Sequence, residues 1–516
     1  MNRFRKFIFN GLLITAVSLL MRSVSVSFNV YLSNKIGAVA MGVFTLISTV
    51  YGFALTVATS GIGLAATRHI AEAVGEDANK GIPACKSLSV RGIVRKCVTY
   101  SLFFSLGSAV ILYLFAPYIG TVLLGDERTV SSLKVLAISL PPVALSSVYN
   151  GYFTAVRRVY KNAIVQVLGQ GIKIFACMGL IALLGSSDVE SACLSVVIGG
   201  TVSELLSFAV QYIFYILEKS AEKDAEIDKK TSSSIWRRVL HTALPVAFSA
   251  YLRSGLVTIE HMLIPWGLER SGSSRDKSLA AYGTVHSMVF PLVLFPSALS
   301  GSFAGLLVPE VAESQASGNE ARIGRIIHRV FHAVLTFAIG TAGIMMCFSY
   351  ELANTVYPDA GAGRYILMIA PLIPVMYLDT SVDGILKGLG EQVYCMVVNI
   401  VDALLSVILV WILLPNMGIT GYILTVYFTE TVNATLSIAR LLTVAKVKPR
   451  MGDWIVKPLL AVVIASAVAR FIAAHLTGAI VGAWELTFYI VLTTAIYLIL
   501  LVIMKGIVIK RKSNRP

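Results

Sequence analysis

The sequence predicts an all-α protein that crosses a membrane many times, with fourteen spanning helices in two parallel six-helix lobes plus two C-terminal helices. Three observations predict this class. Of the 516 residues, 56% are hydrophobic and only 14% are charged, which leaves too little polar surface for a soluble protein. Apolar runs recur from end to end, each long enough to cross about 30 Å of hydrocarbon as a helix. Short patterns in the first half also recur in the second.

The expected spans follow the apolar runs along the chain. They cover residues 7–32, 40–66, 97–119, 133–156, 163–184, 192–217, 239–264, 280–308, 331–350, 365–386, 393–414, 419–442, 457–476 and 484–504. Prolines such as Pro141 and Pro291 inside these runs predict kinks, because a proline cannot complete the helical hydrogen-bond ladder.

The basic residues indicate how the spans are oriented. The net charge is +15, with 43 Lys and Arg residues. Only seven of them fall in alternate loops on one side, namely Lys35, Arg128, Lys134, Arg270, Arg275, Lys277 and Arg364. Because basic loops stay on the cytoplasmic side, both termini are expected in the cytoplasm. The charge therefore orients the chain, and nucleic acid is not expected as a partner.

The hydrophilic stretches divide the chain into four parts. We expect an N-lobe at 1–217, a cytoplasmic linker at 218–238, a C-lobe at 239–450, and a C-terminal helix pair with a basic tail at 451–516. The linker is too short for a soluble catalytic domain, and no phosphate-binding loop pattern occurs. We therefore expect no enzyme activity, no cofactor and no metal site.

An internal duplication supports the two lobes. The sequence "LMRS" at 20–23 matches "YLRS" at 251–254, an offset of 231 residues. Pro141 and Gly151 match Pro374 and Gly384 at an offset of 233. The second and eighth spans match at offsets of 240 and 241, through Ser60-Gly61 with Ser300-Gly301 and "IAE" (70–72) with "VAE" (311–313). Because each repeat has an even number of spans, both copies face the same way, as in parallel-repeat transporters.

Charged residues within the spans are the first candidates for function. On the first span Ser18, Arg22, Ser25 and Asn29 follow helical spacing and form one polar stripe. Arg253 occupies the equivalent place on the seventh span, with Glu260 two turns away. A polar stripe on a spanning helix should face a cavity or the bundle interior. Two guanidinium groups in one cavity would suit a phosphate or pyrophosphate, which Arg binds through paired donors.

Structural roles compete with this interpretation. Arg22 and Arg253 could instead pair with buried carboxylates, for which Glu204, Glu260, Asp379, Asp402 and Glu430 are candidates. Lys173 and Arg470 are interpreted as structural residues or as side chains that extend to the membrane surface. Asp379 and Asp383 on the tenth span could bind a coupling ion, H⁺ or Na⁺, although a paired or solvated role competes.

Several stretches resemble one known family. They are "TSGIGLAATRHIAE", "YNGYFTAVRRVYKNAIVQ", "PVAFSAYLRSGLVTIEHMLIPWGL" and "YGTVHSMVFPLVLFPSALSGSFAGLLVPEVAES". These resemble the stage V sporulation protein B family of polysaccharide exporters, in the superfamily that also holds multidrug transporters and lipid II flippases. The resemblance runs over nearly the whole chain and rests on many weak matches. Where the related flippases have a Glu-Gln pair in the fifth helix, this chain has Gly169-Gln170 before Lys173.

The resemblance implies a flippase of the bacterial cytoplasmic membrane that uses alternating access. Its substrate would be an undecaprenyl-pyrophosphate-linked oligosaccharide, such as a peptidoglycan precursor of the spore cortex, and its partners that lipid-linked sugar, the bilayer and a coupling ion. Arg22 would take the role of a first-helix arginine that lines the cavity. The alternative is a cation-coupled multidrug antiporter of the same superfamily, which the buried carboxylates favour. A membrane-bound sugar polymerase is disfavoured because the expected outer loops are short.

Overall fold

The computed structural model describes residues 3–79, 88–184, 188–218, 229–357, 361–447, 451–476 and 482–504. Within these ranges every regular element is a helix, and no strand occurs. Eleven helices of this described part are long and apolar enough to cross a membrane. The predicted all-α polytopic class is therefore confirmed, whereas the count of fourteen spans is not.

The chain divides into two compact units. The first contains Met1–Phe28, Ala38–Trp266 and Ser274–Gly283, and the second contains Asn29–Gly37, Gly267–Ser273 and Thr284–Pro516. The whole of the seventh expected span therefore belongs to the first unit, together with the beginning of the eighth. The lobe boundaries expected from the sequence remain a prediction.

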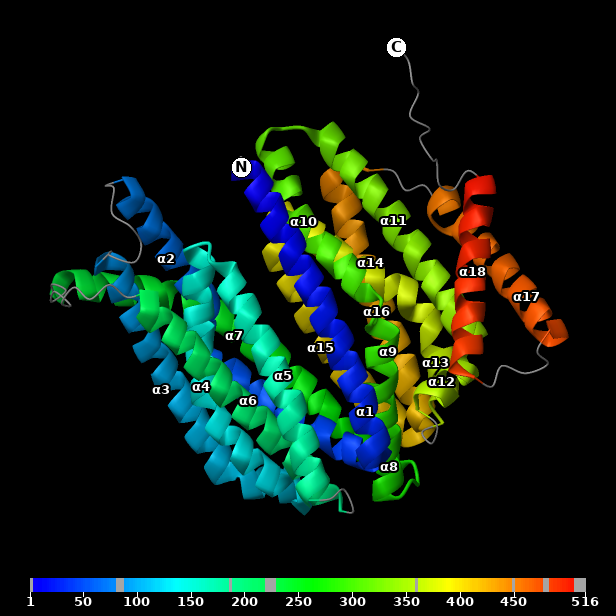
Figure 1. Ribbon diagram of the computed structural model, residues 1–516, viewed down its shortest axis with the longest axis horizontal. Helices are drawn as coiled ribbons and strands as arrows, with labels where there is room; N and C mark the ends of the chain where they lie inside the picture. The colour runs from blue at the N-terminus through cyan, green and yellow to red at the C-terminus, as the bar shows by residue number, and fades with distance from the viewer. Residues whose placement is uncertain are drawn as a thin grey trace, which may run out of the picture. The chain divides into compact units, whose positions relative to one another are not determined.

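The first unit is a bundle of long helices. Its elements are most of α1 (Arg3–Thr59), α2 (Ile62–Asn79), α3 (Leu88–Tyr118), the turns Ile119–Leu123 and Glu127–Thr129, α4 (Val130–Ala155), α5 (Val159–Leu184), α6 (Val189–Glu218), most of α7 (Lys229–Arg270) and α8 (Arg275–Gly283). Helix α4 lies against α3, α6 and α2, and α5 lies against α6 (Figure 1). Helix α4 is therefore central to this bundle.

Helix α1 contains the first two expected spans without a loop between them. The chain reverses at Gly37, whose φ of 81° and ψ of 169° are not helical. A residue with a Cβ rarely adopts this conformation, so glycine is the residue suited to the turn. In the following half of α1, Thr49 and Thr56 contact α7. The hydroxyl of Thr258 donates to the Thr49 carbonyl at 3.5 Å, and that of Thr56 donates to the Ser254 hydroxyl at 3.3 Å.

The core of the first unit lies where α2, α3, α4 and α7 meet. Its buried members include Ile62, Ala66, Tyr100, Tyr149 and Phe153. At Gly151 of α4, an added Cβ would lie 3.0 Å from both the Ala66 Cβ and the Gly63 carbonyl oxygen. Small residues therefore allow α2 and α4 to pack closely.

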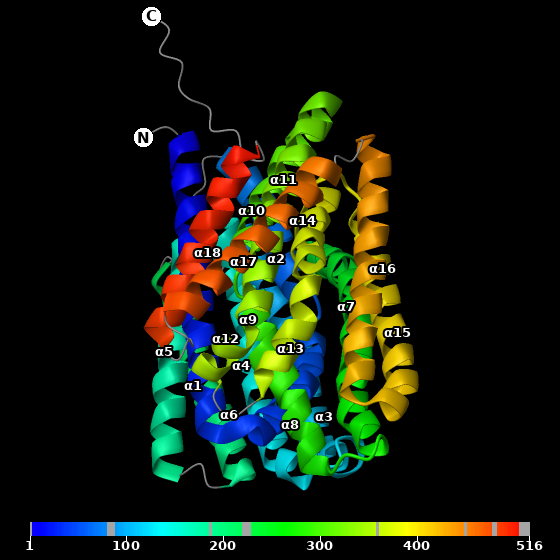
Figure 2. The same ribbon diagram turned by 90° about the vertical axis from the view of Figure 1, so that its right-hand side faces the viewer.

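The second unit contains the rest of the chain. Its elements are Thr284–Val289, α9 (Phe290–Leu294), α10 (Ser297–Ala316), α11 (Glu320–Cys347), α12 (Ser349–Val356), α13 (Ala362–Ile369), Ala370–Leu372, α14 (Ile373–Gly388), α15 (Gln392–Met417), α16 (Ile419–Ala445), Gly452–Val456, α17 (Lys457–Leu476) and α18 (Ala483–Ile503). Helices α15 and α16 lie side by side, as do α17 and α18 (Figure 2). Helix α14 contacts α10, α11 and α16.

The two C-terminal helices pack on α11 through two glycines. A Cβ on Gly340 would lie 2.6 Å from the Tyr497 ring of α18, and one on Gly343 would lie 2.3 Å from a Val462 methyl of α17. The Tyr497 hydroxyl also donates to the Thr336 carbonyl at 2.7 Å. The glycines thus create the space that both helices fill.

Candidate functional site

A polar cavity lies among the membrane-spanning helices of the first unit. Its volume is about 610 Å³, and its walls come from the second half of α1, from α4, α5 and α6. The polar side chains that line it are Thr59, Ser146, Ser147, Asn150, Thr154, Asn162, Gln166, Gln170, Lys173, Ser203, Glu204, Ser207 and Gln211. Such a wall is unusual in a bilayer, where polar side chains are costly and tend to mark functional sites.

Local sequence explains how α5 and α6 form this wall. A Cβ on Gly169 of α5 would lie 2.4 Å from the Ser207 hydroxyl oxygen of α6, so the two helices approach closely there. The Ser203 hydroxyl donates to the Gly169 carbonyl at 2.7 Å. Because small residues occupy the contact, the longer polar side chains on either side of it extend into the cavity.

One end of the cavity carries a network of amide groups. The Asn162 amide donates to the Asn150 carbonyl at 3.1 Å and to the Thr154 hydroxyl at 3.2 Å, which connects α5 to α4. Gln211 of α6 is buried beside them. Amide and hydroxyl groups both donate and accept hydrogen bonds, so this wall can bind a ligand rich in hydroxyl and amide groups.

Two opposite charges face the same cavity. Lys173 comes from α5 and Glu204 from α6, and the two attract each other electrostatically. Together they leave the cavity without net charge. A cavity with one cation, one anion and many amides is suited to a polar, largely uncharged headgroup.

An ion-pair cluster connects the short turn between α4 and α5 to the end of α6, next to the amide end of the cavity. Glu218, at the end of α6, is 7% exposed at its side chain and lies 2.6 Å from the Arg158 guanidinium. Lys161 pairs with the same carboxylate. The hydrogen bond to Glu218 raises the pKa of Arg158 above its usual value, although burial opposes the shift. The cluster fixes the ends of α5 and α6 and hence the width of the cavity.

The second unit contains an apolar groove of about 650 Å³. Its walls are α11, α14 with the residues before it, and α17. Apart from Ser466, Cys347 and Arg470, its lining side chains are aliphatic residues, alanines, methionine and prolines. Arg470 also pairs with Glu351, with one guanidinium nitrogen 3.1 Å from a carboxylate oxygen. The groove has the chemistry of a site for an apolar chain.

The described side chains predicted from the first and seventh spans line neither cavity. Arg22 and Ser25 of α1 are exposed, as is Arg253 of α7, while Glu260 of α7 is half-buried. In the second unit the Asn29 amide donates to the Ser287 carbonyl. The side chain of Ser18 lies outside the described residues. The roles expected for these six residues remain predictions.

The two aspartates expected to bind a coupling ion lie on α14. Asp379 is half-buried and accepts a long hydrogen bond of 3.5 Å from the Asn433 amide of α16. Asp383 forms an ion pair of 3.2 Å with Lys387, one turn further on. Among the described residues no group of three ligands suits a metal ion. An ion-coupling role for this pair stays a prediction.

The sequence contained a signal for the polar cavity that was missed. Asn162, Gln166, Gln170 and Lys173 stand four, four and three residues apart, which places them on one face of α5. This is the same rule that singled out Arg22. Lys173 was instead interpreted alone, as a structural residue or a side chain that extends to the membrane surface, although it is the charged end of a polar stripe.

Comparison with known proteins identifies what the chain is similar to. The family model described as polysaccharide biosynthesis protein matches residues 8–271, and the MatE model matches residues 271–412. Stage V sporulation protein B of Bacillus subtilis (strain 168) is 23% identical over 97% of this chain and 95% of its own length. Lipid II flippase MurJ of the same organism is 22% identical over 61% of both chains.

Solved structures have the same fold. A lipid II flippase MurJ in an inward closed conformation matches with a TM-score of 0.70, at 14% identity over 96% of this chain and 98% of its own. An inward-facing multidrug resistance transporter of the MATE family matches with a TM-score of 0.63, at 14% identity over 84% of this chain and 100% of its own. The family models and the curated relatives confirm the predicted superfamily. The relatives are named a sporulation protein and a flippase, which agrees with the expectation of a protein that is not an enzyme.

Proposed function

Because the chain belongs to the polysaccharide biosynthesis protein family, we propose that it is an alternating-access flippase for a lipid-linked oligosaccharide. The substrate class is an undecaprenyl-pyrophosphate-linked sugar, moved across the bacterial cytoplasmic membrane with both protein termini in the cytoplasm. A peptidoglycan precursor is the first substrate to test, since one relative is named a lipid II flippase and another a sporulation protein.

The observation that carries this proposal is the polar cavity of the first unit. Sugar hydroxyls and N-acetyl groups need donors and acceptors to replace water within the bilayer. The amide and hydroxyl groups around Asn150, Asn162 and Gln170 supply both. A multidrug cavity for lipophilic cations would instead need an uncompensated acidic group, whereas here Lys173 balances Glu204.

The other parts of an amphiphilic substrate also have candidate positions. The apolar groove beside α17 would receive part of the lipid chain, because its wall is aliphatic. Arg22 and Arg253 would bind the pyrophosphate, whose oxygens match the paired donors of a guanidinium. Ser18, Ser25, Asn29 and Glu260 would complete that polar surface, and Asp379 with Asp383 would bind the coupling ion.

The test is transport by the purified protein in liposomes. Fluorescent undecaprenyl-pyrophosphate-linked saccharides are placed in both leaflets of the liposomes. A membrane-impermeant quencher removes the fluorescence of the outer leaflet, and the further decrease in fluorescence gives the rate at which lipids of the inner leaflet cross. We expect the wild-type protein to accelerate crossing of the saccharide lipid. Undecaprenyl phosphate, which carries no saccharide, should compete poorly. No acceleration with any saccharide headgroup, in vesicles where the protein is folded, would contradict the proposal.

A second function has one specific observation in its favour. The MatE model matches residues 271–412, which include Asp379 and Asp383, and half-buried carboxylates can couple cation movement to drug export. A proton-driven antiporter would acidify or alkalinise the vesicle lumen when a lipophilic cation such as ethidium is added. Ethidium movement driven by a pH gradient, without saccharide flipping, would favour this alternative.

A further inference from the structure

Four polar side chains that line the cavity of the first unit have no hydrogen-bond or ion-pair partner among the described residues. They are Gln166, Gln170 and Lys173 of α5 and Glu204 of α6. The Asn162 amide, nearer the start of α5, is by contrast already bonded to α4. Lys173 is half-buried and Glu204 is exposed. This part of the wall is therefore free to bind a ligand.

The backbones of α5 and α6 are held together on both sides of Lys173. One turn before it, the Gly169 carbonyl accepts a hydrogen bond of 2.7 Å from the Ser203 hydroxyl of α6. One turn after it, Cys177 contacts Gly199 of α6, where an added Cβ would lie 2.6 Å from the thiol sulfur. The two helices that carry the opposite charges therefore keep a fixed register along this wall.

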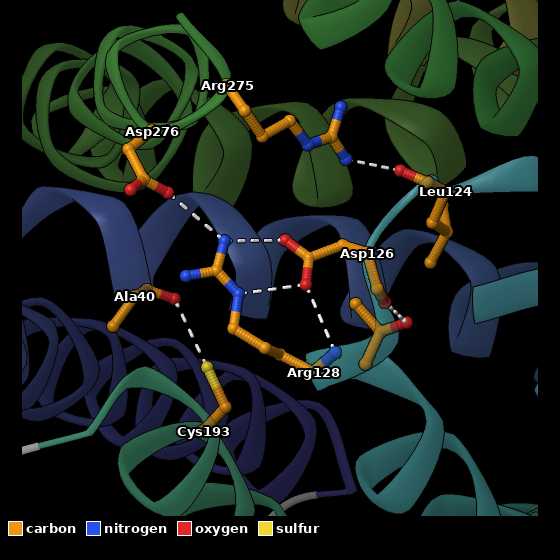
Figure 3. A network of polar contacts seen from close by, with 8 residues as sticks. Ala40, Leu124, Asp126, Arg128, Cys193, Arg275 and Asp276 are labelled. Carbon is orange, nitrogen blue, oxygen red and sulfur yellow. Dashed lines mark hydrogen bonds and ion pairs between the residues drawn. The ribbon is translucent and has the colours of Figure 1, made fainter. Parts of the chain in front are cut away.

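Lys173 and Glu204 attract each other electrostatically, but no ion pair joins them in the described part of the chain. An ion pair that serves the fold of this unit is closed. The Arg128 guanidinium, for example, donates two hydrogen bonds of 2.8 and 2.7 Å to Asp126 (Figure 3). A pair in the cavity that served only the fold would gain by closing in the same way. The open pair instead leaves an ammonium and a carboxylate for opposite charges on a ligand.

A ligand that displaces water from this wall must replace the hydration of both charges. An uncharged headgroup would leave the two charges desolvated, which is costly at low dielectric. A headgroup with a single charge would compensate only one of them. A zwitterionic headgroup supplies a carboxylate for the Lys173 ammonium and an ammonium for the Glu204 carboxylate, and it adds no net charge to the cavity.

We propose that this part of the cavity selects a headgroup that carries one ammonium and one carboxylate, as a short peptide attached to a sugar does. Lys173 binds the carboxylate and Glu204 binds the ammonium. Gln166 and Gln170 bind the peptide groups between them, since a glutamine side chain both donates and accepts. The proposal rests on the flippase function proposed above and adds the class of headgroup.

The test uses four forms of one fluorescent undecaprenyl-pyrophosphate-linked saccharide whose sugar carries a short peptide. The peptide has one free amine and one free carboxyl group, or the amine is acetylated, or the carboxyl group is amidated, or both are blocked. Flipping of each form by the wild-type protein is measured in liposomes. We expect the zwitterionic form to cross fastest. Each single block should slow crossing about tenfold, the order of effect of losing one hydrogen bond between charged groups.

Two variants assign the charges of the ligand to residues of the protein. Lys173→Gln should remove the effect of amidation and keep that of acetylation, and Glu204→Gln should do the reverse. Because each variant is combined with each blocked form, the experiment is a double-mutant cycle between protein and ligand. Lys35→Gln and Glu127→Gln, at exposed residues that do not line the cavity, are the controls and should keep both effects.

Equal crossing rates for the four forms with wild-type protein would overturn the proposal and leave the flippase function standing. This comparison needs no variant, so it decides the matter even if Lys173→Gln or Glu204→Gln does not fold. Effects of acetylation and amidation that persist unchanged in both folded variants would also overturn the proposal.

A binding measurement separates this proposal from the flippase function if no form is flipped. The saccharide peptide without its lipid is added in its four forms to the full-length protein in detergent, and the thermal midpoint is followed, because a ligand that binds the folded state raises it. Stabilisation by the zwitterionic form alone would support the site and contradict only the transport. The absence of stabilisation by that form would overturn the proposal.

Discussion

Lys173 of α5 and Glu204 of α6 face the same cavity of about 610 Å³ within the membrane-spanning part of the first unit. Each charge is costly in a bilayer, and each lowers the cost of the other. The pair makes the cavity polar without giving it a net charge.

Removal of one of these charges should lower the thermal midpoint more than removal of both. Lys173→Met leaves the Glu204 carboxylate without its counter-charge. Glu204→Gln likewise leaves the Lys173 ammonium without its counter-charge. Each single variant should lower the thermal midpoint and slow saccharide flipping, whereas the double variant should recover the midpoint in part because no lone charge remains. Thermal unfolding in detergent and flipping in liposomes measure both effects. A double variant whose loss of stability equals the sum of the single losses would mean that the two charges are not coupled.

Glu218 should be important for stability. Its nearly buried carboxylate accepts from Arg158, Lys161 and Tyr152. Glu218→Ala would therefore leave the Lys161 ammonium, whose side chain is 13% exposed, without its counter-charge. We expect a loss of about 3–5 kcal/mol, the usual effect of breaking a buried ion pair. Glu485→Ala, at the exposed first turn of α18, is the control and should cost far less. Denaturation of both variants checks this, and equal losses would show that the cluster is not structural.

The C-terminal helix pair should depend on Gly343. A Cβ there would overlap Val462 of α17, and overpacking of this kind costs about 1–3 kcal/mol. Gly343→Ala should therefore lower the thermal midpoint, and Val462→Ala in the same protein should restore part of it by making room. Gly107→Ala of α3, with nothing within 4 Å of the new methyl, should be neutral. Failure of Val462→Ala to compensate would exclude a steric cause.

Arg22 tests the anion site predicted from the sequence. If it binds the pyrophosphate, Arg22→Ala should abolish flipping while the protein stays folded in the membrane, and Arg22→Lys should rescue only part because an ammonium lacks the paired donors. Membrane abundance, thermal stability and flipping are compared for both variants. Loss of folded protein in Arg22→Ala would favour a structural role, and normal flipping would exclude the anion site.

The orientation inferred from the loop charges is open to direct test. The linker at 218–238 should lie in the cytoplasm, so Ser232→Cys should react with a membrane-impermeant maleimide only after cells are permeabilised. Reaction in intact cells would reverse the orientation.

The sequence predicted the helices well where apolar runs end in polar residues. The expected span 457–476 is α17, and 393–414 falls within α15 (Gln392–Met417). Kinks were expected at prolines such as Pro291, but the division of an apolar run into separate helices was not predicted. The span expected at 280–308 contains the end of α8, the π-helical segment Thr284–Val289, α9 and much of α10, and the helix is interrupted between Leu294 and Ser297. Hydropathy alone cannot detect such breaks, because a broken helix buried in protein keeps its apolar composition.

The candidate site was harder to predict than the fold. Arg22 and Arg253 attracted attention as single charges, whereas the cavity is built mainly from uncharged amides and hydroxyls on four different helices. Asn150 and Asn162 come together only because α4 and α5 fold back on each other at Arg157 and Arg158.

The most direct test of the central claim is to fill the polar cavity without changing its charge. Ala163 of α5 lines the cavity, and Ala176 of the same helix, also half-buried, does not. Both are replaced by Phe, and the rate of transbilayer movement of the fluorescent undecaprenyl-pyrophosphate-linked saccharide is measured in liposomes with equal amounts of folded protein. The account predicts that Ala163→Phe loses most flipping while Ala176→Phe retains it. Wild-type flipping by folded Ala163→Phe would contradict the claim that the headgroup enters this cavity.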